Sequence, residues 1–182
     1  MRHKLFFIVG ETASGKDSLT RRLCEELGLS QIISYTTRPK REGEGDTHVF
    51  VDDKVYEEMR ASENIAAYTN ISEYHYWSTI DQLYSNDVYI IDPAGIQSIE
   101  ELGINDLDFC TIYINVPIEV RIDRAINRGD DTNVLSKRIY SEAEQFIKFK
   151  ARAGFDYSIS NLNADKAFKI LKKIIEVETA QN

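Results

Sequence analysis

The chain has 182 residues, with 22 Lys and Arg against 30 Asp and Glu, which gives a formal net charge of −8. A chain of this length favours a single domain, and it buries on the order of 70% of the surface that it exposes when unfolded. No apolar stretch approaches the roughly 18 residues that a membrane helix needs. The acidic balance also argues against a nucleic-acid polymer as partner, because that affinity rises with neutralising Lys and Arg.

The first half of the chain begins with a clear strand and helix. The apolar run over residues 5–9 ends at Gly10 and predicts a buried strand. Leu and Cys residues then recur at helical spacing from Gly15 until Gly28, which predicts a helix. Shorter elements follow: a strand over 31–34, a loop over 36–46, an extended piece over 48–51, a helix over 53–60 and a hairpin over 65–76.

The second half returns to alternating strands and helices. The expected elements are a strand over 88–91, a helix through Leu102, a strand over 109–114, a helix from Pro117, a charged helical stretch over 121–152 with a break near Gly129, a strand over 157–159, and an amphipathic helix over 167–175 capped by Asn163. Apolar strands alternating with helices predict an α/β fold whose parallel sheet is covered on both faces. The stretch over 36–87 breaks this alternation and predicts an insertion.

The strongest local signal lies between the first strand and the first helix. Residues 10–16 read Gly-Glu-Thr-Ala-Ser-Gly-Lys, and a strand, a glycine loop and a helix are the context of a P-loop. Glycines let backbone N–H groups approach phosphate oxygens, and the helix N-terminus adds a favourable dipole. A glycine-rich turn with a surface lysine is the alternative. The residues predicted to bind nucleotide are Gly10, Glu11, Thr12, Ala13, Ser14, Gly15, Lys16, Asp17 and Ser18.

The residue after the P-loop lysine departs from the usual pattern. A Ser or Thr that binds Mg²⁺ is expected there, whereas this chain has Asp17 and then Ser18. An aspartate is a hard oxygen ligand and can bind Mg²⁺ directly or through water. Alternatively, Asp17 stabilises the start of the helix and Ser18 is the ligand. Both alternatives stay open.

A second basic segment follows the predicted strand over 31–34. Residues 34–41 combine hydroxyl groups with three cations, and Arg38 and Arg41 are spaced to converge on one phosphate. A solvated basic loop is the alternative. Its place after a strand predicts that it faces the P-loop across the same edge of the sheet.

The cysteines and histidines carry no chemistry of their own. Cys24 and Cys110 are too few for a disulfide framework at this length, and their apolar settings predict small core residues of a reduced, cytosolic protein. The three histidines have no partners at the spacing of a zinc site.

The order of these motifs resembles the guanylate kinase family of nucleoside monophosphate kinases. After the P-loop, the pattern Ser-x-Thr-Thr-Arg-x-x-Arg begins at Ser34. Further similar pieces are residues 46–51, 74–78 and 90–95, the arginines Arg124, Arg128 and Arg138, and residues 156–157 with Asn161. The resemblance implies a P-loop three-layer fold with a core over 1–34, 88–127 and 154–182, a monophosphate-binding insertion over about 35–87 and a helical lid over about 128–153.

The resemblance also implies an activity and its partners. It implies Mg²⁺-assisted transfer of the γ-phosphoryl group of ATP to a nucleoside monophosphate, by a monomer or homodimer. The acceptor phosphate would be held by Arg38, Arg41, His48 and Tyr76, and its base or the active-site network would be addressed by Ser34, Ser78 and Asp92. The implied catalytic residues are Lys16, Arg38, Arg124, Arg128 and Arg138. Such chemistry needs positioning and neutralisation of charge more than covalent help.

Three positions depart from the family pattern. His48 stands where the family has a phosphate-binding tyrosine, and Trp77 stands where it has a glycine. Counting back from Tyr76 puts Ala67 where the family has the glutamate that accepts from guanine, and an alanine cannot accept those hydrogen bonds. Glu73 replaces that glutamate only if a bulge shifts the hairpin.

The acceptor therefore stays open at this point. GMP or dGMP leads, with AMP, pyrimidine monophosphates and modified deoxynucleotides as alternatives. A guanylate-kinase-like binding module is a second class of function. Such modules typically lose the ATP loop, and the retained Gly10, Gly15 and Lys16 argue against it.

Overall fold

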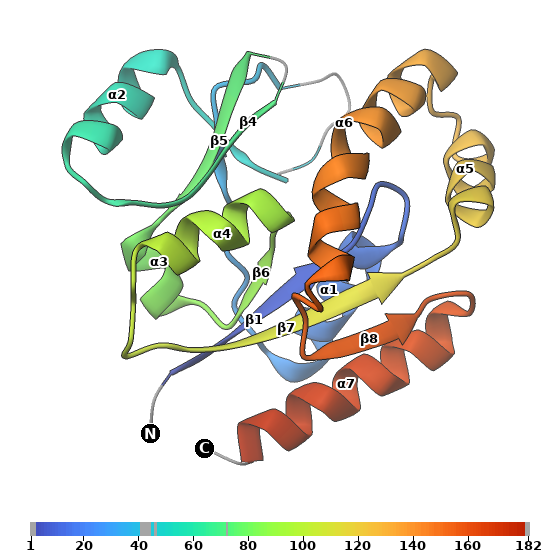
Figure 1. Ribbon diagram of the computed structural model, residues 1–182. Helices are drawn as coiled ribbons and strands as arrows, with labels where there is room; N and C mark the ends of the chain where they lie inside the picture. The colour runs from blue at the N-terminus through green and yellow to red at the C-terminus, as the bar shows by residue number, and fades with distance from the viewer. Residues whose placement is uncertain (1–2, 41–44, 46, 72, 181–182) are drawn as a thin grey trace.

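The computed structural model describes residues 3–40, 45, 47–71 and 73–180. Its main sheet has four parallel strands in the order β6-β1-β7-β8 (Figure 1). These strands are β1 (Lys4–Val9), β6 (Val88–Ile90), β7 (Asp108–Asn115) and β8 (Tyr157–Ser160). The predicted parallel sheet is thus confirmed.

Strand β1 lies at the centre of the sheet and is buried on both faces. Leu5, Phe7 and Val9 point into one hydrophobic cluster, whereas Phe6 and Ile8 point into the other. Side chains alternate along a strand, so a continuous apolar run supplies both faces at once.

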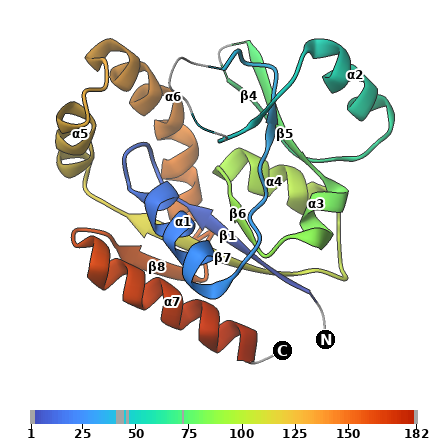
Figure 2. The ribbon, with the colours of Figure 1, turned by 180° about the vertical axis from the view of Figure 1, so that it is seen from behind.

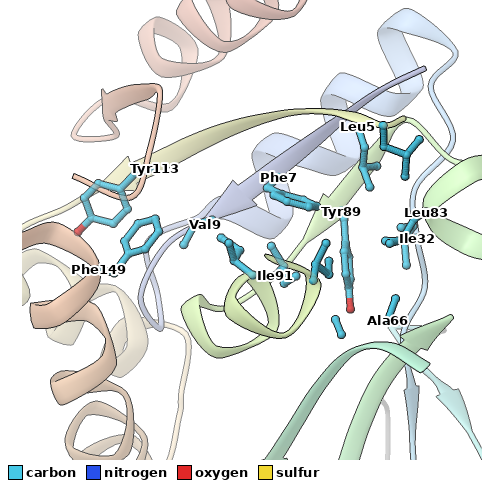
Figure 3. Close-up of a cluster of buried hydrophobic side chains, with 14 of the residues drawn as sticks. Leu5, Phe7, Val9, Ile32, Ala66, Leu83, Tyr89, Ile91, Tyr113 and Phe149 are labelled. Carbon is cyan, nitrogen blue, oxygen red and sulfur yellow. The ribbon is translucent and has the colours of Figure 1, made fainter. Parts of the chain in front are cut away.

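Helices cover the two faces of the sheet separately. One face is covered by α1 (Lys16–Leu27) and α7 (Ala164–Ala180), as Figure 2 shows. The other face carries α3 (Ile80–Ser85), α4 (Pro93–Glu101) and the C-terminal half of α6 (Thr132–Ala151). Figure 3 shows the cluster on this second face, with Tyr113 and Phe149 at one end and Ala66 and Leu83 at the other.

The predicted insertion forms a second sheet of its own. Its strand order is β3-β2-β5-β4, and its elements are β2 (Tyr35–Thr36), β3 (Val49–Phe50), α2 (Asp53–Ala61), β4 (Ile65–Ile71) and β5 (Tyr74–Thr79). Strands β4 and β5 form the predicted hairpin. This sheet is tied to the first because Ser98 of α4 donates a hydrogen bond to the carbonyl of Ala66, at 3.0 Å.

The predicted strand over 31–34 is wrong. Gln31 makes only an isolated parallel bridge to Val88, and the strand forms later, at Tyr35–Thr36 in the second sheet. Ile32 turns its side chain into the core and its N–H bonds to Val88, at 2.8 Å. The chain leaves the main sheet there, which residue preferences alone do not reveal.

The short helix α3, which we did not predict, is held by a capping box between Thr79 and Gln82.

The charged helical stretch breaks where it was expected. Helix α5 (Ile118–Asn127) ends before Gly129, whose φ of 87° lies in the left-handed region. Asp131 then caps α6 by accepting from the N–H groups of Asn133 and Val134, both at 2.9 Å. The expected cap at Asn163 is also present, with Lys166 N–H donating to its side chain at 3.0 Å.

Two further expectations concern burial. Cys110 is buried, and Cys24 is half-buried against the same cluster, as expected of small core residues. None of the helices in the described ranges is both long and apolar enough to cross a membrane.

The packing of α7 can be tested with adjacent residues. Leu171 is fully buried against the sheet, whereas Ile170 is 49% exposed. Leu171→Ala should lower the free energy of unfolding in urea by about 2–5 kcal/mol, because it leaves a cavity. Ile170→Ala should cost about 0.5 kcal/mol. Equal losses for the two variants would contradict this packing.

Candidate active site

The P-loop adopts the backbone shape that binds anions. It joins β1 to α1, and both Ala13 (φ 62°) and Gly15 (φ 84°) are left-handed. Gly15 is the N-cap of α1, and no side chain of the described residues caps this helix. Left-handed residues at a helix start form a nest of N–H groups, to which the helix dipole adds positive potential. The predicted strand, loop and helix are therefore confirmed as a local structure.

Both loop glycines stand where a side chain has no room. A Cβ atom at Gly10 would lie 2.6 Å from Ser14 Oγ and 3.0 Å from the carbonyl of Ile114. A Cβ atom at Gly15 would lie 2.6 Å from Asn161 Nδ2. The loop is thus pressed against β7 on one side and against the residue that follows β8 on the other.

The residues that open α1 differ in their exposure. The ammonium of Lys16 lies 3.5 Å from the carboxylate of Asp17, whose side chain is 76% exposed. Ser18 is also exposed. All three stand at the N-terminus of the helix, where hard oxygen ligands and a cation can meet phosphate groups together.

Two side chains from outside the P-loop donate hydrogen bonds to the carbonyl of Ser14. It accepts from Asn161 Nδ2 at 2.8 Å and from Arg124 Nη1 at 3.4 Å. Arg124 also donates to the carbonyl of Asn161, at 2.6 Å. Predicted as a catalytic residue, Arg124 therefore touches the loop backbone directly. The sequence singled out Asn161 only through the family resemblance. Its hydrogen bond to the P-loop depends on where β8 lies in the fold.

The other two predicted catalytic arginines lie farther along the chain. Arg128 is exposed and pairs with the carboxylate of Asp130, with Nε 2.9 Å from Oδ1. Arg138 is half-buried on α6.

Buried ionic groups hold the second and third residues of the loop. Glu11 accepts from Tyr113 Oη at 2.7 Å and from Lys150 Nζ at 3.1 Å. Glu142 of α6 accepts from the N–H of Thr12 at 2.9 Å. Burial raises the pKa of Glu142, although its hydrogen bonds with Thr12 oppose that shift. No motif in the sequence pointed to these partners, which come from β7 and α6.

Four predicted acceptor-site residues come together on the second sheet. Arg38 is buried and its Nε donates to Tyr76 Oη at 3.1 Å, and Ser34 Oγ lies 3.1 Å from His48 Nδ1. The His48 and Tyr76 rings meet edge to face, with centroids 5.5 Å apart. Pairing of β2 with β5 brings these residues together, since Thr36 stands opposite Tyr76. Arg41 lies outside the described residues.

Asp92 connects the two sheets. Its Oδ1 accepts from Gly95 N–H at 2.7 Å, as the N-cap of α4, and from Thr69 Oγ1 of β4 at 3.2 Å. Burial raises the pKa of Asp92, while these hydrogen bonds and the charge of Lys16 oppose the shift. Ser78, by contrast, is fully buried in β5.

The three departures from the family pattern have distinct environments. Ala67 is 3% exposed and packs in the main core beside a bulge between Ile65 and Tyr68. Glu73 stands exposed at the hairpin turn, with a φ of 72°. Trp77 is 1% exposed and stacks on Tyr35, with centroids 5.5 Å apart. Its ring therefore packs inside the insertion.

The support behind the P-loop can be tested at one residue. Asn161→Ala removes the donor to Ser14, so it should weaken ATP binding by about 3- to 10-fold, measured by calorimetry. Asn163→Ala is the matched control: it removes the cap of α7, costing about 1 kcal/mol of stability, and should leave ATP affinity unchanged. Equal ATP affinity for Asn161→Ala and the unsubstituted protein would contradict the support.

Comparison with known proteins identifies the family. The family model for guanylate kinase matches residues 2–178. A guanylate kinase from Coxiella burnetii is 35% identical, over 97% of this chain and 88% of its own length. Another, from Legionella pneumophila, is 26% identical over 94% and 84% of the two chains. The crystal structure of guanylate kinase from Anaplasma phagocytophilum shares the fold, with a TM-score of 0.70 at 19% identity and coverage of 97% and 87%. The chain belongs to the guanylate kinase family.

Proposed function

We propose that this protein transfers the γ-phosphoryl group of ATP to GMP or dGMP, giving the nucleoside diphosphate and ADP. The observation that carries this proposal is the presence of two phosphate-type sites on two sheets, joined by Asp92. One is the P-loop with Lys16, and the other is the pair of Arg38 and Tyr76. Phosphoryl transfer needs a donor and an acceptor held in line, with cations to neutralise charge on the moving group.

The donor site uses backbone more than side chains. The N–H groups of the P-loop that follow Thr12 and those of the first turn of α1 bind the phosphates of ATP, and Lys16 reaches the β- and γ-phosphates as a point charge. The full donor set that we propose is Gly10, Glu11, Thr12, Ala13, Ser14, Gly15, Lys16, Asp17 and Ser18. Glu11 differs from the rest, because its buried carboxylate faces Tyr113 and Lys150 and so acts by holding the loop.

The acceptor phosphate meets a guanidinium that is already oriented. The Arg38 side chain is held by Tyr76 and by the carbonyl of Pro39, at 2.8 Å from Nη1. An arginine fixed in this way loses little freedom when it binds a phosphate. We propose that Arg41 and His48 complete this site.

The base is read without the glutamate that the family pattern has at the position of Ala67. With Ala67 in the core, no carboxylate from that position accepts from guanine. We propose that Asp92 and Ser34 supply acceptors on that side, with Thr69 orienting Asp92. Ser78 contributes to the packing of this wall, since it is fully buried.

Transfer of the phosphoryl group needs positive charge close to the phosphates, and arginines from the α5 and α6 region supply it. We propose that the segment over about 128–153 is a lid and that about 35–87 binds the monophosphate, on a core formed by the remainder. Arg124 already lies at the loop, whereas Arg128 exchanges Asp130 for phosphate oxygens when the lid closes. Closure also keeps water from the γ-phosphate.

Magnesium fits the groups at the start of α1. The exposed carboxylate of Asp17 and the hydroxyl of Ser18 are hard oxygen donors of the kind that Mg²⁺ prefers. Bound Mg²⁺ supplies charge neutralisation to the phosphates of ATP.

We further propose that the protein works in the cytoplasm, as a monomer or homodimer. The unpaired Cys24 and Cys110 support a reducing location.

The acceptor is tested by ADP formation over a panel of monophosphates. GMP or dGMP should give the highest kcat/KM, at least about tenfold above AMP, CMP and UMP. Comparable or faster turnover with a base other than guanine would overturn the guanylate assignment.

The P-loop mechanism is tested at its lysine. Lys16→Ala should lower kcat/KM by about 100-fold or more without changing the thermal midpoint, because it removes charge from the developing transition state. Lys169→Ala, an exposed lysine of α7, is the control and should leave turnover unchanged. Full activity of Lys16→Ala would refute this mechanism.

The metal ligand is tested by titrating nucleotide affinity with Mg²⁺. If Asp17 is the ligand, Asp17→Asn should raise the Mg²⁺ concentration needed for tight ATP binding by about tenfold, while Ser18→Ala should have little effect. If Ser18 is the ligand, the two results should be exchanged. A Mg²⁺ requirement unchanged in both variants would show that neither side chain binds the metal.

A further inference from the structure

Thr12 of the P-loop is bound by a carboxylate that comes from the proposed lid helix. Glu142 Oε1 accepts from Thr12 N–H at 2.9 Å, and Oε2 accepts from the same N–H and from Thr12 Oγ1, both at 3.0 Å. Main-chain and side-chain donors of one residue therefore converge on one carboxylate. Such charge-assisted hydrogen bonds are stronger than neutral ones and fix the relative position of the two elements.

Arg121 of α5 completes this contact from the other side. Its Nη1 lies 3.3 Å from Glu142 Oε1 and donates to the carbonyl of Thr12, also at 3.3 Å. The Arg121 and Glu142 side chains are only 8% and 14% exposed. The N–H, the hydroxyl and the carbonyl of Thr12 are thus all engaged by this pair.

Such a pair resists displacement by an incoming nucleotide. If Glu142 left, the buried guanidinium of Arg121 would lose its closest carboxylate, since Glu11 lies 4.0 Å away. Removing one partner of a buried ion pair is strongly destabilising. The P-loop N–H groups that follow Thr12 are not used by Glu142, so phosphates can bind while the contact stays in place.

The position of Glu142 on α6 links this contact to an arginine. The inward face of α6 carries Leu135, Arg138, Glu142, Phe146 and Phe149, at the spacing of three or four residues that places side chains on one face of a helix. Phe146 and Phe149 are buried in the main core. Glu142 is the next inward residue, against the P-loop, and Arg138 follows about one turn, or roughly 5.4 Å, beyond it. Figure 1 shows α6 passing beside the loop that follows β1.

We propose that Glu142 is a positioning residue, which fastens α6 to Thr12 and thereby sets Arg138 over the transferring phosphoryl group. Arg121 holds the Glu142 carboxylate in place. This inference rests on the proposed kinase function. It concerns a residue outside every motif considered above, and it predicts an effect on the rate of transfer more than on the binding of ATP.

A double-mutant cycle between Glu142 and Arg138 tests this role. Glu142→Gln keeps the size of the side chain and loses its charge, so it should lower kcat with GMP about tenfold and change both KM values less than about threefold. In an Arg138→Ala background, the same substitution should change kcat less than about twofold, because the residue through which it acts is gone. Glu144→Gln, on the exposed face of α6, is the matched control and should leave kcat unchanged.

Two kinetic outcomes would overturn the proposal. Additive losses in the cycle would mean that Glu142 does not act through Arg138. A lower KM for ATP in Glu142→Gln would mean that the carboxylate competes with nucleotide. If Glu142→Gln does not fold, Thr12→Ala removes one of the contacts from the other side and should show the same coupling to Arg138, with a smaller loss of about threefold. Additive effects of Thr12→Ala and Arg138→Ala on kcat would also overturn the proposal.

Hydrogen exchange separates this inference from the proposed function. Without any substrate, Glu142→Gln should speed exchange of the Thr12 amide at least about fivefold relative to Glu144→Gln. Unchanged exchange would overturn the contact with Thr12 whatever the acceptor is. Faster exchange in a protein that phosphorylates no monophosphate would support the contact and refute the proposed function instead.

Discussion

The arrangement of this molecule depends on one constraint: the P-loop backbone must be held firmly while its N–H groups stay available to phosphate. The structure meets it by holding the loop through carbonyls, side chains and the N–H of Thr12, which Glu142 binds. Asn161 and Arg124 bind the carbonyl of Ser14, and Tyr113 binds the side chain of Glu11. An anion site formed in this way loses little freedom when ligand arrives, so more of the binding energy remains for catalysis.

These hydrogen bonds to the P-loop also bear on how charged side chains are distributed around the two phosphate sites. The chain carries a net charge of −8, yet the groups around the two phosphate sites include Lys16, Arg38 and Arg124. Carboxylates nearby are each engaged, with Glu142 on Thr12 and Asp92 on Gly95 and Thr69. Glu142 and Asp92 thus act as supports, whereas Lys16, Arg38 and Arg124 supply positive charge around the two sites.

Much of the fold was predictable because it depends on local patterns. The apolar run over residues 5–9 must be buried on both faces, and Gly28 and Gly129 end helices because they adopt left-handed backbone angles. The prediction of a strand over 31–34 was wrong because residues of these types suit a strand in either sheet. Only the path of the chain between the two sheets decides where strand pairing begins. The P-loop was predictable for the same reason as the strands, since its function resides in consecutive residues. The clustering of Arg38, His48 and Tyr76 followed from resemblance and agrees with the pairing of β2 with β5.

The sequence by itself determined the α/β alternation, the P-loop, the break before α6 and the family to which the chain belongs. Only the tertiary structure decided which side chains support that loop. Asn161, Arg121 and Glu142 stand far from the P-loop in the chain, and none lies in a motif that predicts its partner. Their roles arise from where β8, α5 and α6 pack, because a hydrogen bond depends on distance and direction in space, whatever the separation along the chain.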